Sequence, residues 1–180
     1  MRSVFKQVAI LIIAVMINVT ANAQEKGDIA VGGKFEIGSG DGLTNIGLGG
    51  KFQYNVIKPL RLEGSATYFF PKKWRAEGSV MSSKISMWDF SANAQYLFFL
   101  SDKFVLYPLA GLSLCGAETK TRNTNNGSWY NSSTSKAGLN IGGGIDVKIT
   151  DNLVFNAELK YKAVSDWDRT LVSVGLMYKL

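Results

Sequence analysis

Three consecutive glycines at positions 142–144, followed by Asp146 and Lys148, are the first feature of this chain that could bind a ligand. A glycine-rich phosphate loop joins a strand to a helix and is followed by Lys-Ser/Thr, or it has the spaced GxGxxG pattern. Neither pattern is present here. Alternate residues from Leu139 to Thr150 are apolar or small in one set and polar, charged or glycine in the other. This period-2 pattern predicts a strand in which the glycines serve packing.

Side chains for enzymatic chemistry are few, because the sequence contains no histidine. A histidine general base and a histidine-ligated metal site are thereby excluded. Asp89, Asp146 and Glu158 could form carboxylate pairs, but each is expected beside Lys or Arg, which favours ion pairing. The single Cys115 cannot form an internal disulfide. The sequence therefore indicates a non-enzymatic protein without a cofactor or a resident metal.

The alternation recurs along the chain and predicts about eight strands of the length that a tilted membrane strand needs. In the segment 104–115 both faces are apolar, so its register cannot be read. Pro108 has no backbone donor for a sheet and predicts a bulge or an irregular place in that strand. The predicted strands fall within residues 27–38, 45–56, 61–70, 87–98, 104–115, 139–150, 153–161 and 169–180.

The connections between these segments alternate in length. Short turns are expected around Lys58-Pro59, at 101–103 and at 150–152. The other connections are longer or more polar: 39–43, 71–83, 116–136 and 163–168. Short turns on one side and long loops on the other are typical of an outer-membrane barrel, with the short turns and both chain ends in the periplasm.

The N-terminus predicts export. Arg2 and Lys6 precede an apolar run at 8–17 that is too short to span a bilayer as a helix, and Ala21-Asn22-Ala23 resembles a cleavage site. We expect a signal peptide of residues 1–23 and a barrel domain of residues 24–180. The formal net charge of +6 is weak evidence for nucleic-acid binding, and export argues against it.

Two closed barrels fit the alternation: a soluble carrier with apolar residues inside, and a membrane barrel with apolar residues outside. Aromatic residues near the ends of the apolar faces favour the membrane barrel, since they predict two interfacial girdles. The girdle candidates are Tyr54, Tyr68, Phe70, Trp88, Tyr96, Phe98, Tyr161 and Tyr178. The polar faces combine both signs of charge, which suits a closed lumen. These lumen candidates are Lys34, Glu36, Lys51, Arg61, Glu63, Asp89, Asp146, Lys148, Glu158 and Lys160.

The last eight residues resemble the C-terminal assembly signal of outer-membrane barrels, with Ser173, Gly175, Tyr178 and Leu180 at its key positions. Phe is commoner than Leu at the last position. The whole chain resembles the small barrels of the OmpA/OmpX type. This resemblance implies an all-β, eight-stranded antiparallel up-and-down transmembrane β-barrel in the bacterial outer membrane, preceded by a cleavable signal peptide. It also implies a monomer that is inserted by the barrel-assembly machinery and contacts outer-membrane lipid and lipopolysaccharide.

The leading functional hypothesis is an envelope-structural or adhesion-type protein with a plugged lumen. It would make its surface contacts through extracellular loops at 71–83 and 116–136. Lys72, Lys73 and Arg75 could meet lipopolysaccharide phosphates, although such a charged run is also typical of a solvated loop. Trp129 and Tyr130 could form a binding tip for an unknown surface or host ligand, or could pack against the neighbouring loop. The alternative hypothesis is a small porin-like channel for ions or small solutes.

Overall fold

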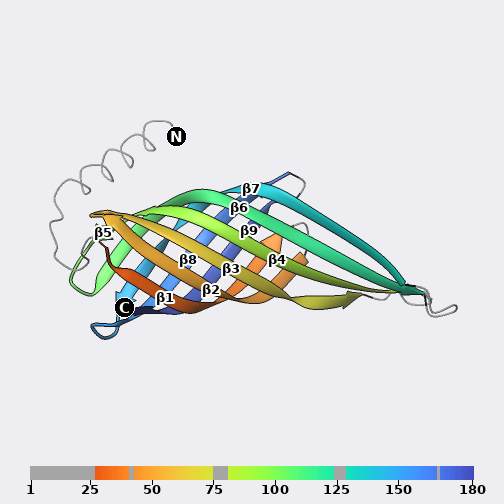
Figure 1. Ribbon diagram of the computed structural model, residues 1–180, viewed down its shortest axis with the longest axis horizontal. Coiled ribbons are helices and arrows are strands. Elements are labelled where there is room, and N and C mark those ends of the chain that lie inside the picture. Colours follow the sequence, from red (N-terminus) through yellow and green to blue (C-terminus); the bar gives the residue numbers. More distant parts are fainter. Residues whose placement is uncertain (1–26, 41–42, 75–80, 124–128, 166) are drawn as a thin grey trace, which may run out of the picture.

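Nine strands form one closed antiparallel sheet in the part of the chain that the computed structural model describes, residues 27–40, 43–74, 81–123, 129–165 and 167–180 (Figure 1). Each strand pairs with the next along the chain, except that β4 and β5 both pair with β6, and β1 pairs with β9. The strands are β1 (Ile29–Gly40), β2 (Leu43–Ile57), β3 (Leu60–Trp74), β4 (Met81–Tyr96), β5 (Phe98–Phe99), β6 (Phe104–Asn123), β7 (Trp129–Lys148), β8 (Leu153–Val164) and β9 (Arg169–Lys179). The predicted signal peptide at 1–23 lies outside the described residues.

The barrel has eight strands in space, as the sequence predicts, because β5 continues β4. Both pair with β6 in the same register, from Gln95 opposite Leu109 to Phe98 opposite Leu106. The ladder is interrupted between these pairs, where Pro108 of β6 has no N–H to donate. The irregularity expected from Pro108 thus appears in the neighbouring strand, at Leu97, whose backbone N–H donates to the Pro59 carbonyl on the side of β3 at 2.8 Å.

The short turns lie where the sequence predicts them. The Ser101 hydroxyl accepts hydrogen bonds from the backbone N–H groups of Lys103 and Phe104 (3.3 and 3.2 Å). The Thr150 hydroxyl accepts one from the backbone N–H of Leu153 at 3.0 Å. Such side-chain bonds to the backbone stabilise turns that Ser and Thr favour.

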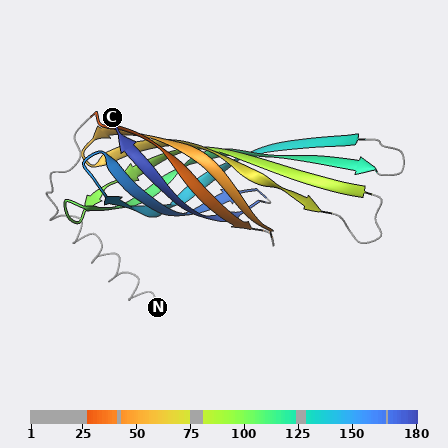
Figure 2. The same cartoon turned by 90° about the horizontal axis from the view of Figure 1, so that it is seen from below.

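The strands β4, β6 and β7 are the longest, and together with β3 they continue past the barrel on the side of the long connections (Figure 2). β6 and β7 have 20 residues each, whereas β1 and β8 have 12. The prediction of loops at 71–83 and 116–136 is therefore wrong over most of both segments. Ser and Thr favour this extended pairing across strands, as between the hydroxyls of Ser83 and Thr121 at 3.0 Å. We call residues 70–74, 81–86, 118–123 and 129–135 the protruding sheet.

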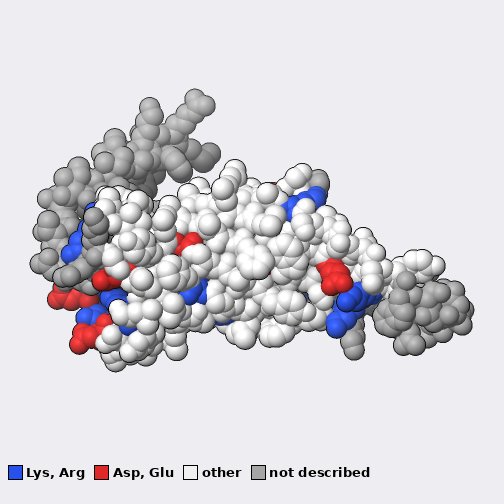
Figure 3. All heavy atoms as spheres, in the orientation of Figure 1, with Lys and Arg blue, Asp and Glu red and all other residues white. Residues whose placement is uncertain are grey.

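The barrel is polar inside and apolar outside. Leu112 and Ile141 are 63% and 65% exposed, whereas Lys34 and Glu36 are 2% and 0% exposed. A broad band of uncharged surface separates charged groups at the two ends of the molecule (Figure 3). This arrangement inverts that of a soluble carrier and suits a surrounding of lipid. No helix among the described residues is long and apolar enough to cross a membrane.

Candidate functional site

Ten charged side chains are buried among the described residues, and their formal charges cancel. Each is at most 4% exposed. A buried charge without a partner costs several kcal/mol, so equal numbers of both signs favour a closed lumen. The cations are Lys34, Lys51, Arg61, Lys160 and Lys162, and the anions are Glu36, Glu63, Asp89, Asp146 and Glu158.

Lys51 of β2 connects β2 with β3 and β8 in this network. Its Nζ lies 2.7 Å from a carboxylate oxygen of Glu158 on β8 and 3.4 Å from one of Glu63 on β3. It also donates a hydrogen bond to the side-chain oxygen of Asn156 at 2.6 Å. One ammonium group thus holds two carboxylates that would otherwise repel each other across the lumen.

Arg61 of β3 occupies the part of the lumen toward the short turns. Its Nη1 donates to Asp146 at 2.6 Å and its Nε donates to the Gln95 amide oxygen at 2.5 Å. The guanidinium carbon lies 4.8 Å from the ring centre of Tyr107, a cation–π arrangement. The Asn156 amide donates to Asp146 at 2.7 Å and so joins this group to Lys51.

Two further ion-pair groups lie toward the protruding sheet. Lys34 Nζ donates to Glu36 at 2.8 Å, and Lys160 Nζ lies 3.7 Å from Glu36 and 3.3 Å from Glu158. The ion pair of Lys162 with Asp89 completes the set. These pairs extend the charged filling of the lumen from Arg61 to the barrel mouth.

Sequence reasoning missed several members of the network. Lys162 follows Glu158 and Lys160 on the same face of β8, so the alternation extended by one step would have found it. The neutral amides of Gln95 and Asn93 donate to Glu63 at 2.9 and 3.1 Å. Both amides are polar residues at the same alternate positions of β4 as Asp89, so the alternation was an available signal for them as well.

Tyr107 is a further missed member, since both faces of its strand are apolar in sequence. Its hydroxyl donates to Glu158 at 2.8 Å and accepts from the Asn156 amide at 2.5 Å. The substitution Tyr107→Phe is expected to lower the free energy of unfolding by about 1–3 kcal/mol, because Glu158 and Asn156 each lose one buried hydrogen-bond partner. Urea unfolding in lipid vesicles measures this loss. Tyr178→Phe is the matched control, since Tyr178 is 53% exposed, and an equal loss in both variants would contradict the assignment.

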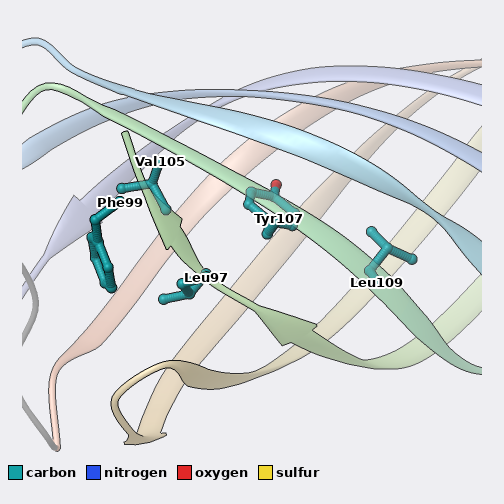
Figure 4. Close-up of a cluster of buried hydrophobic side chains, with 5 residues drawn as sticks. All are labelled: Leu97, Phe99, Val105, Tyr107 and Leu109. Carbon is teal, nitrogen blue, oxygen red and sulfur yellow. The ribbon is translucent and has the colours of Figure 1, made fainter. Parts of the chain in front are cut away.

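An apolar layer lines the lumen on the side of β5 and β6, beside the charged network and toward the short turns. It consists of Leu97, Phe99, Val105, Tyr107 and Leu109, all at most 6% exposed (Figure 4). The structure thus gives the register that the sequence left open: the odd-numbered residues of β6 from Val105 onward face inward, and Pro108 faces outward. Apolar side chains beside paired charges fill this part of the lumen and oppose a continuous water path through the barrel.

Lys148 differs from the other lumen candidates. Its side chain is 35% exposed and pairs with Asp151 in the following turn at 2.8 Å. This hydrogen bond lowers the pKa of the exposed Asp151 carboxyl. The prediction that Lys148 joins the buried network is wrong, because the residue lies at the last position of β7, where the barrel meets solvent.

The aromatic candidates lie on the outer surface at both ends of the barrel. Tyr68 is paired in register with Trp88 toward the protruding sheet, and Tyr178 with Leu153 toward the short turns. Trp88 and Phe98 are half-buried, and each contacts a neighbouring ring, Phe90 at 5.4 Å and Tyr96 at 4.9 Å between centroids. The exposed members are Tyr54, Tyr68, Phe70, Tyr96, Tyr161 and Tyr178.

The four residues of the predicted C-terminal assembly signal lie on β9 and just after it. Ser173 is buried in the lumen, whereas Tyr178 and Leu180 are 53% and 76% exposed. Gly175 packs against β1, where a Cβ would lie 2.5 Å from the Gly33 carbonyl oxygen. The alternation places the aromatic residue of the signal on the lipid-facing side.

Four of the five candidate surface contacts lie on the protruding sheet. Lys72 and Tyr130 are exposed, Tyr130 to 62%. The backbones of Lys73 and Trp129 belong to β3 and β7. Arg75 lies outside the described residues. The structure therefore places these candidates on paired strands rather than on one loop tip.

Comparison with known proteins gives a family and a set of similar folds. A family model described as outer membrane protein beta-barrel domain matches residues 8–179. No curated protein that was compared matches the chain.

Several solved structures are similar over nearly their whole length. Ail, the attachment invasion locus protein of Yersinia pestis, is 19% identical with a TM-score of 0.59, covering 86% of this chain and 99% of its own. Neisserial surface protein A is 20% identical with a TM-score of 0.58, covering 85% and 96%. A major outer membrane protein from Thermus thermophilus is 12% identical with a TM-score of 0.62, covering 83% and 99%. At these identities the similarity shows the fold.

Proposed function

The chain belongs to the outer membrane protein beta-barrel family and is an integral protein of the bacterial outer membrane, and we propose that it is a non-enzymatic surface-interaction protein. Its contacts are made by the protruding sheet, while the barrel serves as its membrane anchor. The proposal includes cleavage after Ala23, a barrel domain of residues 24–180, insertion by the barrel-assembly machinery, a monomeric state and lipopolysaccharide as a neighbour.

The unpaired edges of the protruding sheet are the observation that supports this function best. β7 pairs with β6 from Trp129 onward, but its pairing with β8 begins only at Gly138. β3 pairs with β2 only as far as Phe69. In the described part of the chain, residues 129–135 and 70–74 therefore have a neighbouring strand on one side only. Such edges can bind an extended segment of a partner protein through main-chain hydrogen bonds.

The name of one protein of similar structure supports the same class of function. Ail is the attachment invasion locus protein of Yersinia pestis. Because its similarity to this chain shows the fold alone, the proposal rests on the edges and not on that name.

The filled lumen argues against the alternative, a small channel. The charged network and the apolar layer both occupy the interior, and barrels of eight strands are only wide enough for side chains. We therefore expect no stable unitary conductance from the purified protein in a planar bilayer.

Shortening the protruding sheet tests the proposed function. Thr119 and Ser132 are opposite each other in the register, so an Asn-Gly turn can replace residues 120–131 and close the hairpin. Bacteria that produce the full-length protein are expected to be retained on cultured epithelial cells or on immobilised matrix proteins several-fold more than cells with an empty vector. The shortened variant is expected to fall to the vector level.

The folded state must be equal in both proteins, as judged by a heat-dependent shift on gels. Equal retention of the shortened and full-length proteins would overturn the role of the protruding sheet. Stable channels in the bilayer experiment would instead assign the protein to solute transport.

A further inference from the structure

A row of basic residues crosses three neighbouring strands of the protruding sheet. The register places Lys73 of β3 opposite Lys84 of β4, and Lys84 opposite Lys120 of β6. The side chains of Lys84 and Lys120 are exposed. Like charges directly opposite each other destabilise a sheet. The arrangement becomes favourable when an anion lies between the two ammonium groups.

Lys84 and Lys120 lie on the outer face, which continues the lipid-facing surface of the barrel. Lys84 shares its side of β4 with Trp88 and Phe90, and Lys120 shares its side of β6 with Leu114. Lys84 precedes Trp88 by four residues, which is roughly 13 Å along the strand. Since Trp side chains lie at the membrane interface, the two lysines are at the height of the lipid headgroups.

We propose that Lys84 and Lys120 form a binding site for the phosphate groups of lipopolysaccharide in the surrounding leaflet. The inference rests on the proposed function and its orientation, with the protruding sheet outside the cell. Neighbouring strands are about 4.8 Å apart, so both ammonium groups can reach oxygens of one phosphate. Their charge-assisted hydrogen bonds would hold the outer face of the sheet at the membrane surface and leave the strand edges free for a partner.

Glu118 is the acidic residue within this site. Its carboxylate lies 3.0 Å from Lys120 Nζ, and both side chains are about half exposed. An exposed ion pair of this kind is weak, so a phosphate can replace the carboxylate. Glu118 therefore competes with the phosphate for Lys120.

Lys72, which the sequence suggested as a contact for lipopolysaccharide phosphates, lies on the other face of the same sheet and therefore offers a matched control. It is exposed, and its register partner is Ile85, which directly follows Lys84 along β4. Consecutive residues of a strand point to opposite faces, so Lys72 and Lys84 lie on opposite sides of the sheet. A general effect of positive charge would weaken binding equally when either lysine is removed. A site on the outer face is weakened when Lys84 is removed but not when Lys72 is removed.

Binding of a phosphorylated lipid tests the proposal. The protein is purified in detergent, freed of bound lipid and titrated against fluorescent bisphosphorylated lipid A, with dephosphorylated lipid A and a heparin oligosaccharide as comparison probes. The double variant Lys84→Gln/Lys120→Gln is expected to weaken lipid A binding about 30-fold, and Lys72→Gln by less than about twofold. Glu118→Gln is expected to tighten binding about two- to fivefold. Lys84→Arg/Lys120→Arg is expected to bind like the unsubstituted protein, since Arg retains the charge.

Equal losses in Lys72→Gln and the double Gln variant would overturn the site, as would equal binding of phosphorylated and dephosphorylated lipid A. Loss of heparin binding with retained lipid A binding would instead assign the row to a soluble sulfated glycan. The double Gln variant is expected to keep its adherence to cells, because the strand edges are unchanged. Failure of this proposal and failure of the proposed surface interaction are therefore measured separately.

Discussion

Replacing Lys51 with methionine is expected to lower the free energy of unfolding of the barrel by about 3–5 kcal/mol. Lys51 Nζ is fully buried and lies 2.7 Å from Glu158 and 3.4 Å from Glu63. The substitution retains much of the side-chain volume but leaves both carboxylates in the lumen with one excess negative charge. Urea unfolding of the refolded protein in lipid vesicles, followed by tryptophan fluorescence, measures the change.

Restoring the balance of charge separates electrostatics from packing. Adding Glu158→Gln to Lys51→Met makes the buried charges equal again, and we expect this pair to recover more than half of the lost free energy. Lys58→Met, at an exposed lysine in a short turn, is expected to stay within about 0.5 kcal/mol of the unsubstituted protein. If Lys51→Met were as mild as Lys58→Met, the lumen could not be the closed, dry interior described above.

The substitution Gly142→Ala is expected to destabilise the barrel by about 3 kcal/mol, the upper end of the range for overpacking. A Cβ at this position would lie 2.2 Å from the Leu159 carbonyl oxygen and 2.8 Å from the Lys160 Cα. Both are backbone atoms of β8, so no side-chain rotation can relieve the contact. The strands β7 and β8 would have to separate, and urea unfolding in lipid vesicles would show the loss.

Gly64 provides the matched control for this prediction. It lies within β3, and a Cβ added there would meet nothing within 4 Å. Gly64→Ala is expected to be neutral or to stabilise by up to about 1 kcal/mol, because alanine lowers the conformational entropy of the unfolded chain. Equal losses at both positions would mean that general strand propensity, and not the close approach of β7 and β8, determines the effect.

The alternation of residues was enough to predict eight strands and the inward position of most charges. Lys34 and Glu36 are separated by one residue on β1 and both face the lumen. Their position follows from local strand geometry, and the difference between lipid and lumen makes the two faces chemically distinct. No knowledge of distant contacts was needed for this part of the structure.

The apolar layer could not be predicted in the same way. Val105 and Leu106 are both apolar, yet one faces the interior and the other is 46% exposed. Where the lumen itself is apolar, both faces of a strand have the same preference and the pattern gives no register. The partners of Tyr107 on β8 are also about 50 residues away in sequence, so only the closed barrel brings them together.

The protruding sheet was missed for a related reason. Outside the membrane both faces of a sheet meet water, so the alternation disappears and the polar residues of 116–136 resemble those of a loop. Tyr130 and Thr121 are opposite each other in the register. Their preference for extended structure was a signal, but it is weaker than that of a lipid-facing strand.

The pairing of β1 with β9 has a consequence for how the molecule assembles. With β4 and its continuation β5 taken as one strand, all other pairs are neighbours in sequence and can form as hairpins, whereas this seam joins Gly32 to Met177 across almost the whole chain. A partly assembled sheet would expose two rows of unpaired backbone groups to hydrocarbon, where each costs several kcal/mol. Insertion into the bilayer and closure of the seam must therefore be coupled, and synthesis of the last strand sets the earliest moment at which any of the barrel can be stable in the membrane.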